Sequence, residues 1–234
     1  MIMLRPAGQR GHADRGWLNS WFTFSFADYH DPAHMGFRAL RVINDDVIAP
    51  GKGFGAHAHR DMEIITYMLE GNLAHKDSTG EQHVIGPNTI QAMSAGTGIV
   101  HSEFNASENE ASHSLQIWIE PAMEDAEPSY QQIAFSPAER RNRFRLLAGP
   151  HPHDGSAVIR QDASVYAAEV SPGDTLHRNI AAGRHAWVQV ARGRMVMNGH
   201  NLAAGDGAAI SDEAELSFTG DGAGPAEFLY FDLA

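Results

Sequence analysis

Residues 53–63 read Gly53-Phe54-Gly55-Ala56-His57-Ala58-His59-Arg60-Asp61-Met62-Glu63 and place two histidines one residue apart. A second pair with the same gap, His101 and Glu103, follows another glycine-rich approach. On a β-strand, side chains at positions i and i+2 point to the same face, with Cα atoms roughly 6.5 Å apart. Each pair can therefore present two side chains together, while Ala58 and Ser102 face the other way. Strands that are neighbours, or that face each other inside a small barrel, would bring all four side chains to one point.

The side chains of His57, His59, His101 and Glu103 form a donor set suited to one divalent metal ion. Three neutral imidazoles and one carboxylate leave a net charge of about +1 around such an ion, and an octahedral metal keeps two positions open for water or substrate. A lone His-x-His pair more often belongs to a solvated loop, and a buried histidine is more often a hydrogen-bonded core residue than a ligand. Two matched pairs favour the metal site over both of these alternatives.

Short apolar or alternating runs between glycine, asparagine, aspartate and proline residues predict a chain of many short strands. The clearest runs are 39–43, 64–69, 115–119, 187–190 and 228–231. The only good helix start is Ser136-Pro137-Ala138-Glu139, with an N-cap serine, a proline at the first helical position and a glutamate three residues after the serine. One helical turn is expected there. It lies between two strand-rich stretches, so the domain boundary is placed near residue 134.

The two halves of the chain also resemble each other weakly. Residues 69–73, followed by the turn 86–88, are similar to residues 191–195, followed by the turn 205–207. A duplicated barrel would explain this similarity. Chance likeness among glycine-rich turns explains it equally well, so the sequence leaves both explanations open.

Composition argues against several classes of protein. The chain has 234 residues, a formal net charge of −12 and no cysteine. Its 17 lysine and arginine residues are mostly scattered, which does not favour binding to nucleic acid. Without cysteine no thiolate site can form, so a metal must sit on nitrogen and oxygen atoms. No apolar run is long enough for a secretory signal or a membrane span, so we expect a cytoplasmic protein that does not bind membranes.

The residue spacing resembles that of a known superfamily. The first cupin motif is matched by glycine, histidine and acidic positions at Gly51, His57, His59, Glu63 and Gly71. The second cupin motif is matched at Gly96, Gly98, His101 and Asn105. Longer segments, 21–29, 53–63 and 93–103, resemble the pirin family, in particular the bacterial pirin-like quercetin 2,3-dioxygenases. The likeness spans essentially the whole chain, including its ending at 228–233.

The resemblance implies an all-β bicupin of the cupin superfamily, with two β-barrel (jelly-roll) domains. Residues 1–133 are expected to form an N-terminal metal-binding barrel, and residues 134–234 a degenerate C-terminal barrel without metal. In pirins the second motif supplies the carboxylate ligand, which implies the metal ligands His57, His59, His101 and Glu103. This removes Glu63 from the ligands. Glu63 then lies behind the site or in its pocket, or it is an ordinary solvated strand glutamate.

The resemblance further implies a metal-dependent dioxygenase that cleaves flavonols such as quercetin with O2 and releases CO. Its substrate would be a small planar aromatic molecule, and Glu103 would act as catalytic base toward the substrate hydroxyl. Fe(2+) is the preferred ion, with Zn, Mn, Co, Ni or Cu as alternatives. Because pirins include partner-binding regulators, an iron-dependent redox sensor that binds a protein partner without turnover is an alternative function. A sugar-isomerase cupin is a third, and a monomer is the default assembly.

Two further groups of residues are assigned no place in the site. Histidines of the second half lack ligand partners at the matching spacing and are expected to be scattered barrel or surface residues: His177, His185 and His200. Large aromatic residues near the N-terminus are expected to pack in the core rather than line a pocket: Trp17, Trp21, Phe22, Phe24, Phe26 and Tyr29.

Overall fold

The structure is a computed structural model that describes residues 1–153 and 155–234, and nearly all regular structure in these residues is β-strand. Contacts between Cα atoms divide the chain into two compact units. The N-terminal unit consists of Gly11–Phe135 and Pro150–Gln161. The C-terminal unit consists of Met1–Arg10, Ser136–Gly149 and Asp162–Ala234.

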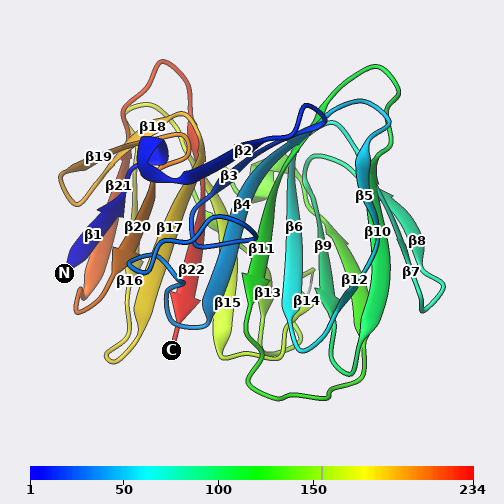
Figure 1. Ribbon diagram of the computed structural model, residues 1–234. Coiled ribbons are helices and arrows are strands. Elements are labelled where there is room, and N and C mark those ends of the chain that lie inside the picture. Colours follow the sequence, from blue (N-terminus) through cyan, green and yellow to red (C-terminus); the bar gives the residue numbers. More distant parts are fainter. Residues whose placement is uncertain (154) are drawn as a thin grey trace. The chain divides into compact units, whose positions relative to one another are not determined.

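The N-terminal unit contains two antiparallel sheets and the short strand β14, which belongs to neither of them. Its strands are β2 (Gly11–Asp14), β3 (Leu18–Phe22), β4 (Leu40–Ile48), β5 (Gly53–His59), β6 (Glu63–Glu70), β7 (Leu73–Asp77), β8 (Gln82–Ile85), β9 (Thr89–Ser94), β10 (Ile99–Asn105), β11 (Ser112–Ile119), β12 (Ser129–Ala134) and β14 (Ala157–Val158). The larger sheet has the order β12-β9-β6-β11-β4-β3-β2, and the smaller has the order β5-β10-β7-β8 (Figure 1). Side chains of β10 contact side chains of β9 and β11, so the inner faces of the two sheets meet.

The C-terminal unit repeats this arrangement. Its strands are β1 (Ile2–Arg5), β13 (Phe144–Gly149), β15 (Ala163–Val170), β16 (Thr175–Asn179), β17 (His185–Arg192), β18 (Arg194–Met197), β19 (His200–Ala203), β20 (Gly207–Ile210), β21 (Glu215–Gly220) and β22 (Ala226–Leu233). They form one sheet with the order β1-β20-β17-β22-β15-β13 and another with the order β16-β21-β18-β19. Two 3₁₀ turns, η1 (Ala7–Gln9) and η2 (Pro137–Glu139), belong to the same unit.

These two units confirm the predicted all-β fold class and favour duplication over chance similarity. The order β9-β6-β11-β4 in one unit matches β20-β17-β22-β15 in the other, and β5-β10-β7-β8 matches β16-β21-β18-β19. The similar segments seen in the sequence occupy equivalent turns. Gly71 precedes β7 with φ +67°, and Gly193 precedes β18 with φ +76°, a left-handed conformation that favours glycine.

The sequence pattern predicted the position of the main strands correctly. Four of the five apolar runs fall within β6, β11, β17 and β22, and the run 39–43 begins one residue before β4. The predicted helical turn is η2, where the backbone N–H of Ser136 donates to Oε2 of Glu139 at 2.7 Å. Central strands such as β6 are buried at nearly every position, because neighbouring strands cover their edges and both faces are packed.

The units differ from the predicted domain limits of 1–133 and 134–234 in two places. Residues Met1–Arg10 belong to the C-terminal unit, because β1 pairs antiparallel with β20 along its whole length. Residues Pro150–Gln161 belong to the N-terminal unit, where Gln131 Nε2 donates to the carbonyl of Val158 at 2.9 Å. The domain limits of 1–133 and 134–234 stay a prediction.

Within residues 1–153 and 155–234, the structure has no helix of the length and apolarity that a membrane crossing requires.

Candidate metal centre

Strands β5 and β10 place the two sequence pairs side by side. They are antiparallel neighbours, with His57 opposite His101 and His59 opposite Ile99. Between His101 and Glu103 the register shifts, because β5 contributes one extra residue there. As the one-residue gap within each pair predicted, the intervening Ala58 is exposed, while His101 and Glu103 are both buried.

Close approach of these strands depends on a glycine. A Cβ atom added at Gly53 would lie 2.2 Å from the backbone oxygen of Glu103 and 2.5 Å from the Cα of Phe104. Both obstacles are backbone atoms of β10, which cannot rotate away. A side chain at this position would therefore push β5 from β10 at the site where their histidines meet.

We expect Gly53→Ala to lower the free energy of unfolding by about 1–3 kcal/mol, the usual cost of overpacking. Denaturant unfolding of the metal-free protein measures this change. Gly55→Ala is the matched control on the same strand, since a Cβ there meets no atom within 4 Å. Equal stability of the two variants would contradict the steric role given to Gly53.

Three imidazole rings converge where β5 and β10 meet. Ring centroids lie 4.8 Å apart for His57 and His59, 4.4 Å for His57 and His101, and 4.9 Å for His59 and His101. One nitrogen from each ring lies within 4.8 Å of the others, which is close enough for a shared metal ion. Nε2 of His101 is buried and has no hydrogen-bond partner among the described residues. Nδ1 of His57 lies 2.8 Å from the carbonyl of Gly55, which leaves its Nε2 as the ring's lone-pair donor.

Glu103 is a buried carboxylate held by two glutamine side chains. Gln91 Nε2 donates to its Oε1 at 2.6 Å, and Gln116 Nε2 donates to its Oε2 at 2.9 Å. Thr66 Oγ1 links the glutamines, since it donates to Gln116 Oε1 at 2.9 Å and lies 3.3 Å from Gln91 Nε2. Sequence reasoning missed both glutamines, although Gln116 interrupts an apolar run in a way that marks one strand face as polar.

The structure thus places three of the four predicted ligands, His57, His59 and His101, close enough together to bind one metal ion. Glu103 forms a second group of this kind with His101 and His75, a buried histidine of β7 that the sequence did not single out. His101 belongs to both groups and joins them. The complete set of His57, His59, His101 and Glu103 remains a prediction.

Burial keeps two of these histidines neutral, which is the form that binds metal. Burial and the neighbouring His57 lower the pKa of His59 to about 4. Burial lowers the pKa of His101 to about 3, and the nearby His57, His59 and His75 act in the same direction. Burial raises the pKa of Glu103, although His75 and the hydrogen bonds from the glutamines oppose this rise. A carboxylate with a raised pKa is a better proton acceptor than an exposed one.

Glu63 is not a solvated strand glutamate. It is 2% exposed, and its Oε2 accepts a hydrogen bond from Ser94 Oγ at 2.6 Å. Burial raises its pKa. Of the two expectations for Glu63, the solvated one is therefore wrong.

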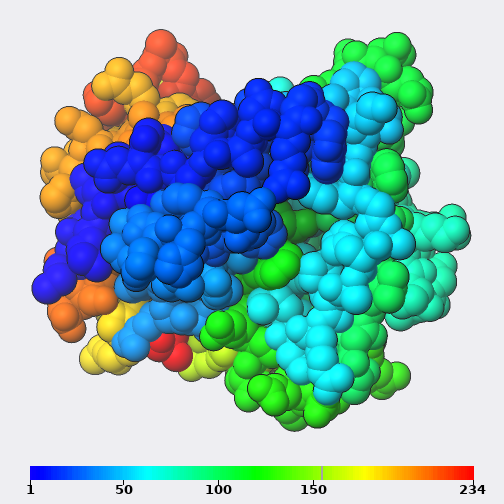
Figure 2. Space-filling view, viewed as in Figure 1, coloured from blue at the N-terminus to red at the C-terminus, as the bar shows by residue number. Residues whose placement is uncertain are grey.

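An apolar cavity of about 290 Å³ opens beside His57 and His59. Figure 2 shows the surface hollowed between the blue N-terminal strands and cyan β5, with green atoms at the bottom of the hollow. Aromatic residues contribute a large part of the cavity wall: Trp17, Phe22, Phe26, Phe54 and Trp118. His57, His59 and Glu103 contribute the polar part of the wall nearest the metal group.

The prediction that the N-terminal aromatic residues serve only the core is wrong for three of them. Trp17, Phe22 and Phe26 line the cavity. These residues lie just before β3, at its end and in the loop after it, near the β3-β2 edge of the larger sheet, where a cavity lies beside the sheet. Composition shows that such residues are buried but does not show what they face.

The cavity also contains a second buried carboxyl, Asp46, which sequence reasoning missed. Asp46 is 5% exposed, and Ser20 Oγ donates a hydrogen bond to its Oδ1. Burial raises the pKa of Asp46 from 3.8 to about 7, with Glu103 and Asp45 acting in the same direction. Next to it, Asn44 Oδ1 is buried and has no hydrogen-bond partner in the described part of the chain. This end of the cavity can accept hydrogen bonds from a ligand's hydroxyl groups.

The raised pKa of Asp46 predicts a pH-dependent cost to stability. Between the ordinary value of 3.8 and about 7 the folded protein holds a proton that the unfolded chain releases, so stability falls as pH rises through this interval. We expect Asp46→Asn to remove this dependence. As pH rises through the interval, the unfolding free energy of the variant should therefore increase relative to that of the parent, by at most about 1.4 kcal/mol per pH unit.

Urea unfolding at several pH values between 4.5 and 8 would measure this difference in unfolding free energy. The metal-free proteins are used because a bound cation would itself change the pKa of a neighbouring carboxyl group. Parallel curves for Asp46→Asn and the parent chain across this range would show that Asp46 is ionised in the folded state throughout.

In the C-terminal unit, apolar residues occupy the positions equivalent to His75 and Glu103. The register places Met197 where β7 has His75, and Phe218 where β10 has Glu103. Both are fully buried in one hydrophobic cluster. Of the scattered histidines, His177 is exposed beside Glu215 and His185 Nδ1 lies 2.7 Å from Ser211 Oγ. The absence of metal from this unit stays a prediction.

Comparison with known proteins agrees with the fold. The family model described as pirin matches residues 3–119, and the model described as the quercetinase C-terminal cupin domain matches residues 146–233. A protein named quercetin 2,3-dioxygenase from Escherichia coli (strain K12) is 47% identical over 233 residues, covering 100% of this chain and 99% of its own.

Two solved structures of the E. coli protein YhhW are similar over the whole chain. The first has a TM-score of 0.96 at 46% identity and covers 100% of this chain and 98% of its own. The second, described as a bacterial pirin in complex with nickel(II), has a TM-score of 0.94 at 46% identity and covers 100% and 99% of the two chains. With identity at this level from end to end and matched models for both halves, this chain belongs to the pirin family.

Proposed function

We propose that this pirin is a metal-dependent dioxygenase that cleaves flavonols such as quercetin with O2 and releases CO. One observation carries the proposal: three histidine side chains meet within metal-binding distance, and two of them, His57 and His59, line an apolar cavity that also has aromatic residues in its wall. The names of its relatives support the same activity, since the E. coli protein is called a quercetin 2,3-dioxygenase and the YhhW structure holds nickel(II).

A divalent cation fits the residues that are present. His101 Nε2 is a buried lone-pair donor that lacks a partner in the described residues, and His57 is hydrogen-bonded through the opposite ring nitrogen. The proposed ligands are His57, His59, His101 and Glu103, all nitrogen or oxygen donors. A bound divalent ion would supply Lewis-acid stabilisation of negative charge on the hydroxyl and carbonyl oxygens of a flavonol. Ferrous iron is the proposed ion, because imidazole and carboxylate ligands with open positions suit iron that handles oxygen.

The cavity suits a planar aromatic substrate that carries hydroxyl groups. Rings such as Trp17, Phe26 and Trp118 offer flat apolar faces and edges against which an aromatic ligand can pack. Asn44 and Asp46 offer acceptors at the polar end. Pockets for small ligands combine these features, apolar walls with a few placed polar groups that fix orientation.

Glu103 is the proposed catalytic base. It lines the cavity beside His57 and His59, and its burial raises its pKa and hence its proton affinity. The amide groups of Gln91 and Gln116 fix the carboxylate without neutralising it. Glu103 would take the proton of the substrate hydroxyl, while the aromatic walls exclude water from the ring that reacts.

Oxygen uptake and carbon monoxide release, measured with quercetin on iron-loaded protein, test this function. We expect one molecule of CO to be released for each molecule of O2 consumed. Metal-free protein should neither consume O2 nor release CO. In the alternative function the protein would not turn over oxygen, so metal-dependent binding to a protein partner without gas exchange would support the redox-sensing regulator. Metal analysis of protein made without added metal tests the choice of ion, since stoichiometric zinc without iron would count against iron.

A further inference from the structure

We propose that Asp77 and His75 form a hydrogen-bonded chain that fixes the ring of His101 with its Nε2 free to bind metal. His75 would thus be a positioning residue for the metal group, one step removed from the ion. The inference rests on the proposed metal site, but its structural part, the tautomer of His101, can be observed without any metal.

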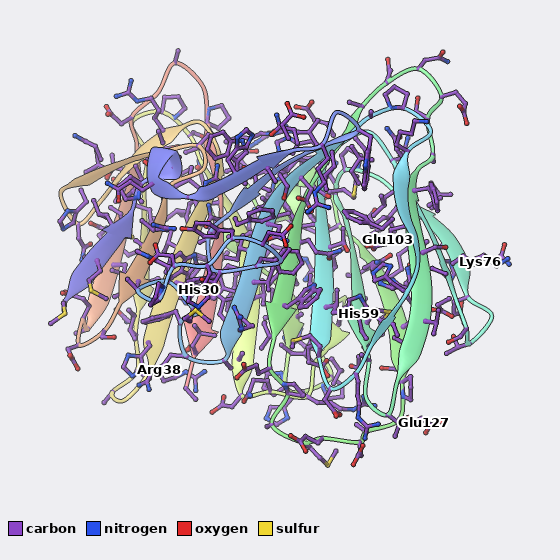
Figure 3. The ribbon with its side chains drawn as sticks, viewed as in Figure 1. His30, Arg38, His59, Lys76, Glu103 and Glu127 are labelled. Atoms are coloured by element: carbon purple, nitrogen blue, oxygen red, sulfur yellow. The ribbon has the colours of Figure 1, made fainter. Side chains whose placement is uncertain are left out.

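The chain is built on the strand next to β10 in the smaller sheet. Strand β7 pairs antiparallel with β10, with Asp77 opposite His101 and His75 opposite Glu103. The side chains of His75 and Asp77 point into the interior and are completely buried. Lys76, between them, projects away from β7 into solvent (Figure 3). His75 and Asp77 therefore repeat, on a third strand, the one-residue gap of the two ligand pairs.

The distances describe a continuous chain of hydrogen bonds. His75 Nε2 lies 2.9 Å from Asp77 Oδ2, and His75 Nδ1 lies 3.5 Å from His101 Nδ1. Asp77 is held in turn by its other oxygen, which accepts from Thr79 Oγ1 at 2.6 Å and from the backbone N–H of Thr79 at 2.8 Å. The chain thus begins at an anchored carboxylate and ends on a ring of the metal group.

Only one placement of protons keeps both bonds and leaves a lone pair for metal. A carboxylate only accepts hydrogen bonds, so His75 Nε2 carries a proton. Nδ1 of a neutral His75 is then an acceptor, and the His101 Nδ1 that faces it must carry a proton. His101 Nε2 is left without one, and it is the buried atom for which the described residues offer no partner.

Direct metal ligation by His75 is the competing explanation, because His75, His101 and Glu103 also lie within metal-binding distance. Both ring nitrogens of His75 are already engaged, one by Asp77 and one by His101. The ring of Tyr130 lies against its face at 4.7 Å. A metal on His75 would have to replace the bond to His101 and would compete with the group on β5. The hydrogen-bonded role needs no such rearrangement.

Partners behind metal-binding histidines typically affect metal affinity by about 10–100-fold. We expect His75→Leu, which removes the acceptor, to weaken binding of Ni(2+) to the metal-free protein by an amount in this range. His75→Asn should bind close to the parent, because its Oδ1 can stand near the place of Nδ1 and accept from His101. Competition with a chromophoric chelator measures all three affinities.

His83→Leu is the matched control. His83 lies opposite His75 on β8 and stacks on the same Tyr130 ring at 4.8 Å, but it is bonded to Glu81 rather than His101. Equal affinities of His75→Leu and His83→Leu would overturn the proposal. So would a loss in His75→Asn as large as in His75→Leu.

Nitrogen-15 spectra of the metal-free parent protein test the tautomer directly and do not depend on whether a variant folds. We expect a protonated Nδ1 and a bare Nε2 on His101, and the reverse assignment would refute the chain. In cadmium-113-loaded protein, one-bond coupling to a nitrogen of His75 would show it to be a ligand instead. Absence of quercetin turnover would contradict the proposed function, but it would leave the results on the His101 tautomer and on metal binding unchanged.

Discussion

His101→Ala is expected to give a folded protein that no longer retains a metal ion. His101 stands opposite His57 on the neighbouring strand, and its ring lies within 5 Å of both other rings of the group. It is also the most enclosed of the three, at 2% exposure, so no outside donor can replace it readily. Loss of a direct ligand should cost more than the ~100-fold upper range seen for residues behind a ligand. Turnover of quercetin should disappear with the metal.

Metal content after dialysis, measured by mass spectrometry, checks this result. His113→Ala is the control, because His113 Nε2 lies 2.6 Å from Asp45 Oδ1 and the residue does not line the cavity. Both variants should unfold cooperatively, and only His101→Ala should lose metal. Full metal occupancy in His101→Ala would remove His101 from the ligands.

Local spacing was enough to predict which side chains share a face. The gap of one residue in His57-x-His59 and His101-x-Glu103 needs only the two-residue period of a strand, and β5 and β10 have that period. The prediction that the two pairs meet depended on the resemblance to cupins and pirins, because pairing between strands far apart in sequence is not a local property.

Residues that support the metal group from other strands could not be predicted in this way. Gln91, Gln116 and His75 reach Glu103 or His101 from β9, β11 and β7, and nothing in their own segments shows which side chains they contact. Only the register of four strands places them there. The sequence offered two signals, the polar Gln116 within an apolar run and the one-residue gap between His75 and Asp77.

The membership of the first ten residues in the C-terminal unit could not be predicted from local sequence either. β1 lies at the start of the chain but pairs with β20, more than two hundred residues later. Its short apolar sequence fits any sheet edge, so its own residues do not select a partner. A boundary placed by strand density near residue 134 cannot detect a strand that joins the other unit.

Glu103→Gln should retain the metal ion and lose about 10²–10⁴-fold in turnover, the usual contribution of a positioned base. The substitution keeps the side chain's size and one oxygen but mimics the protonated carboxyl, which cannot take a second proton. It also turns an acceptor into a donor beside two amide groups. Gln91 and Gln116 both donate to Glu103, so one of these contacts becomes donor against donor. We therefore expect a stability loss of roughly 1–3 kcal/mol in addition to the loss of turnover.

Glu63→Gln separates the two effects. Glu63 is as buried as Glu103 and accepts a hydrogen bond from Ser94, but it does not line the cavity. It should show a stability loss of the same kind with turnover unchanged. Oxygen uptake at saturating quercetin, compared for the two variants at equal metal content, makes the distinction. If both variants turn over at the parent rate, the proton has another acceptor, and Asp46, the other buried carboxyl of the cavity, becomes the first residue to test.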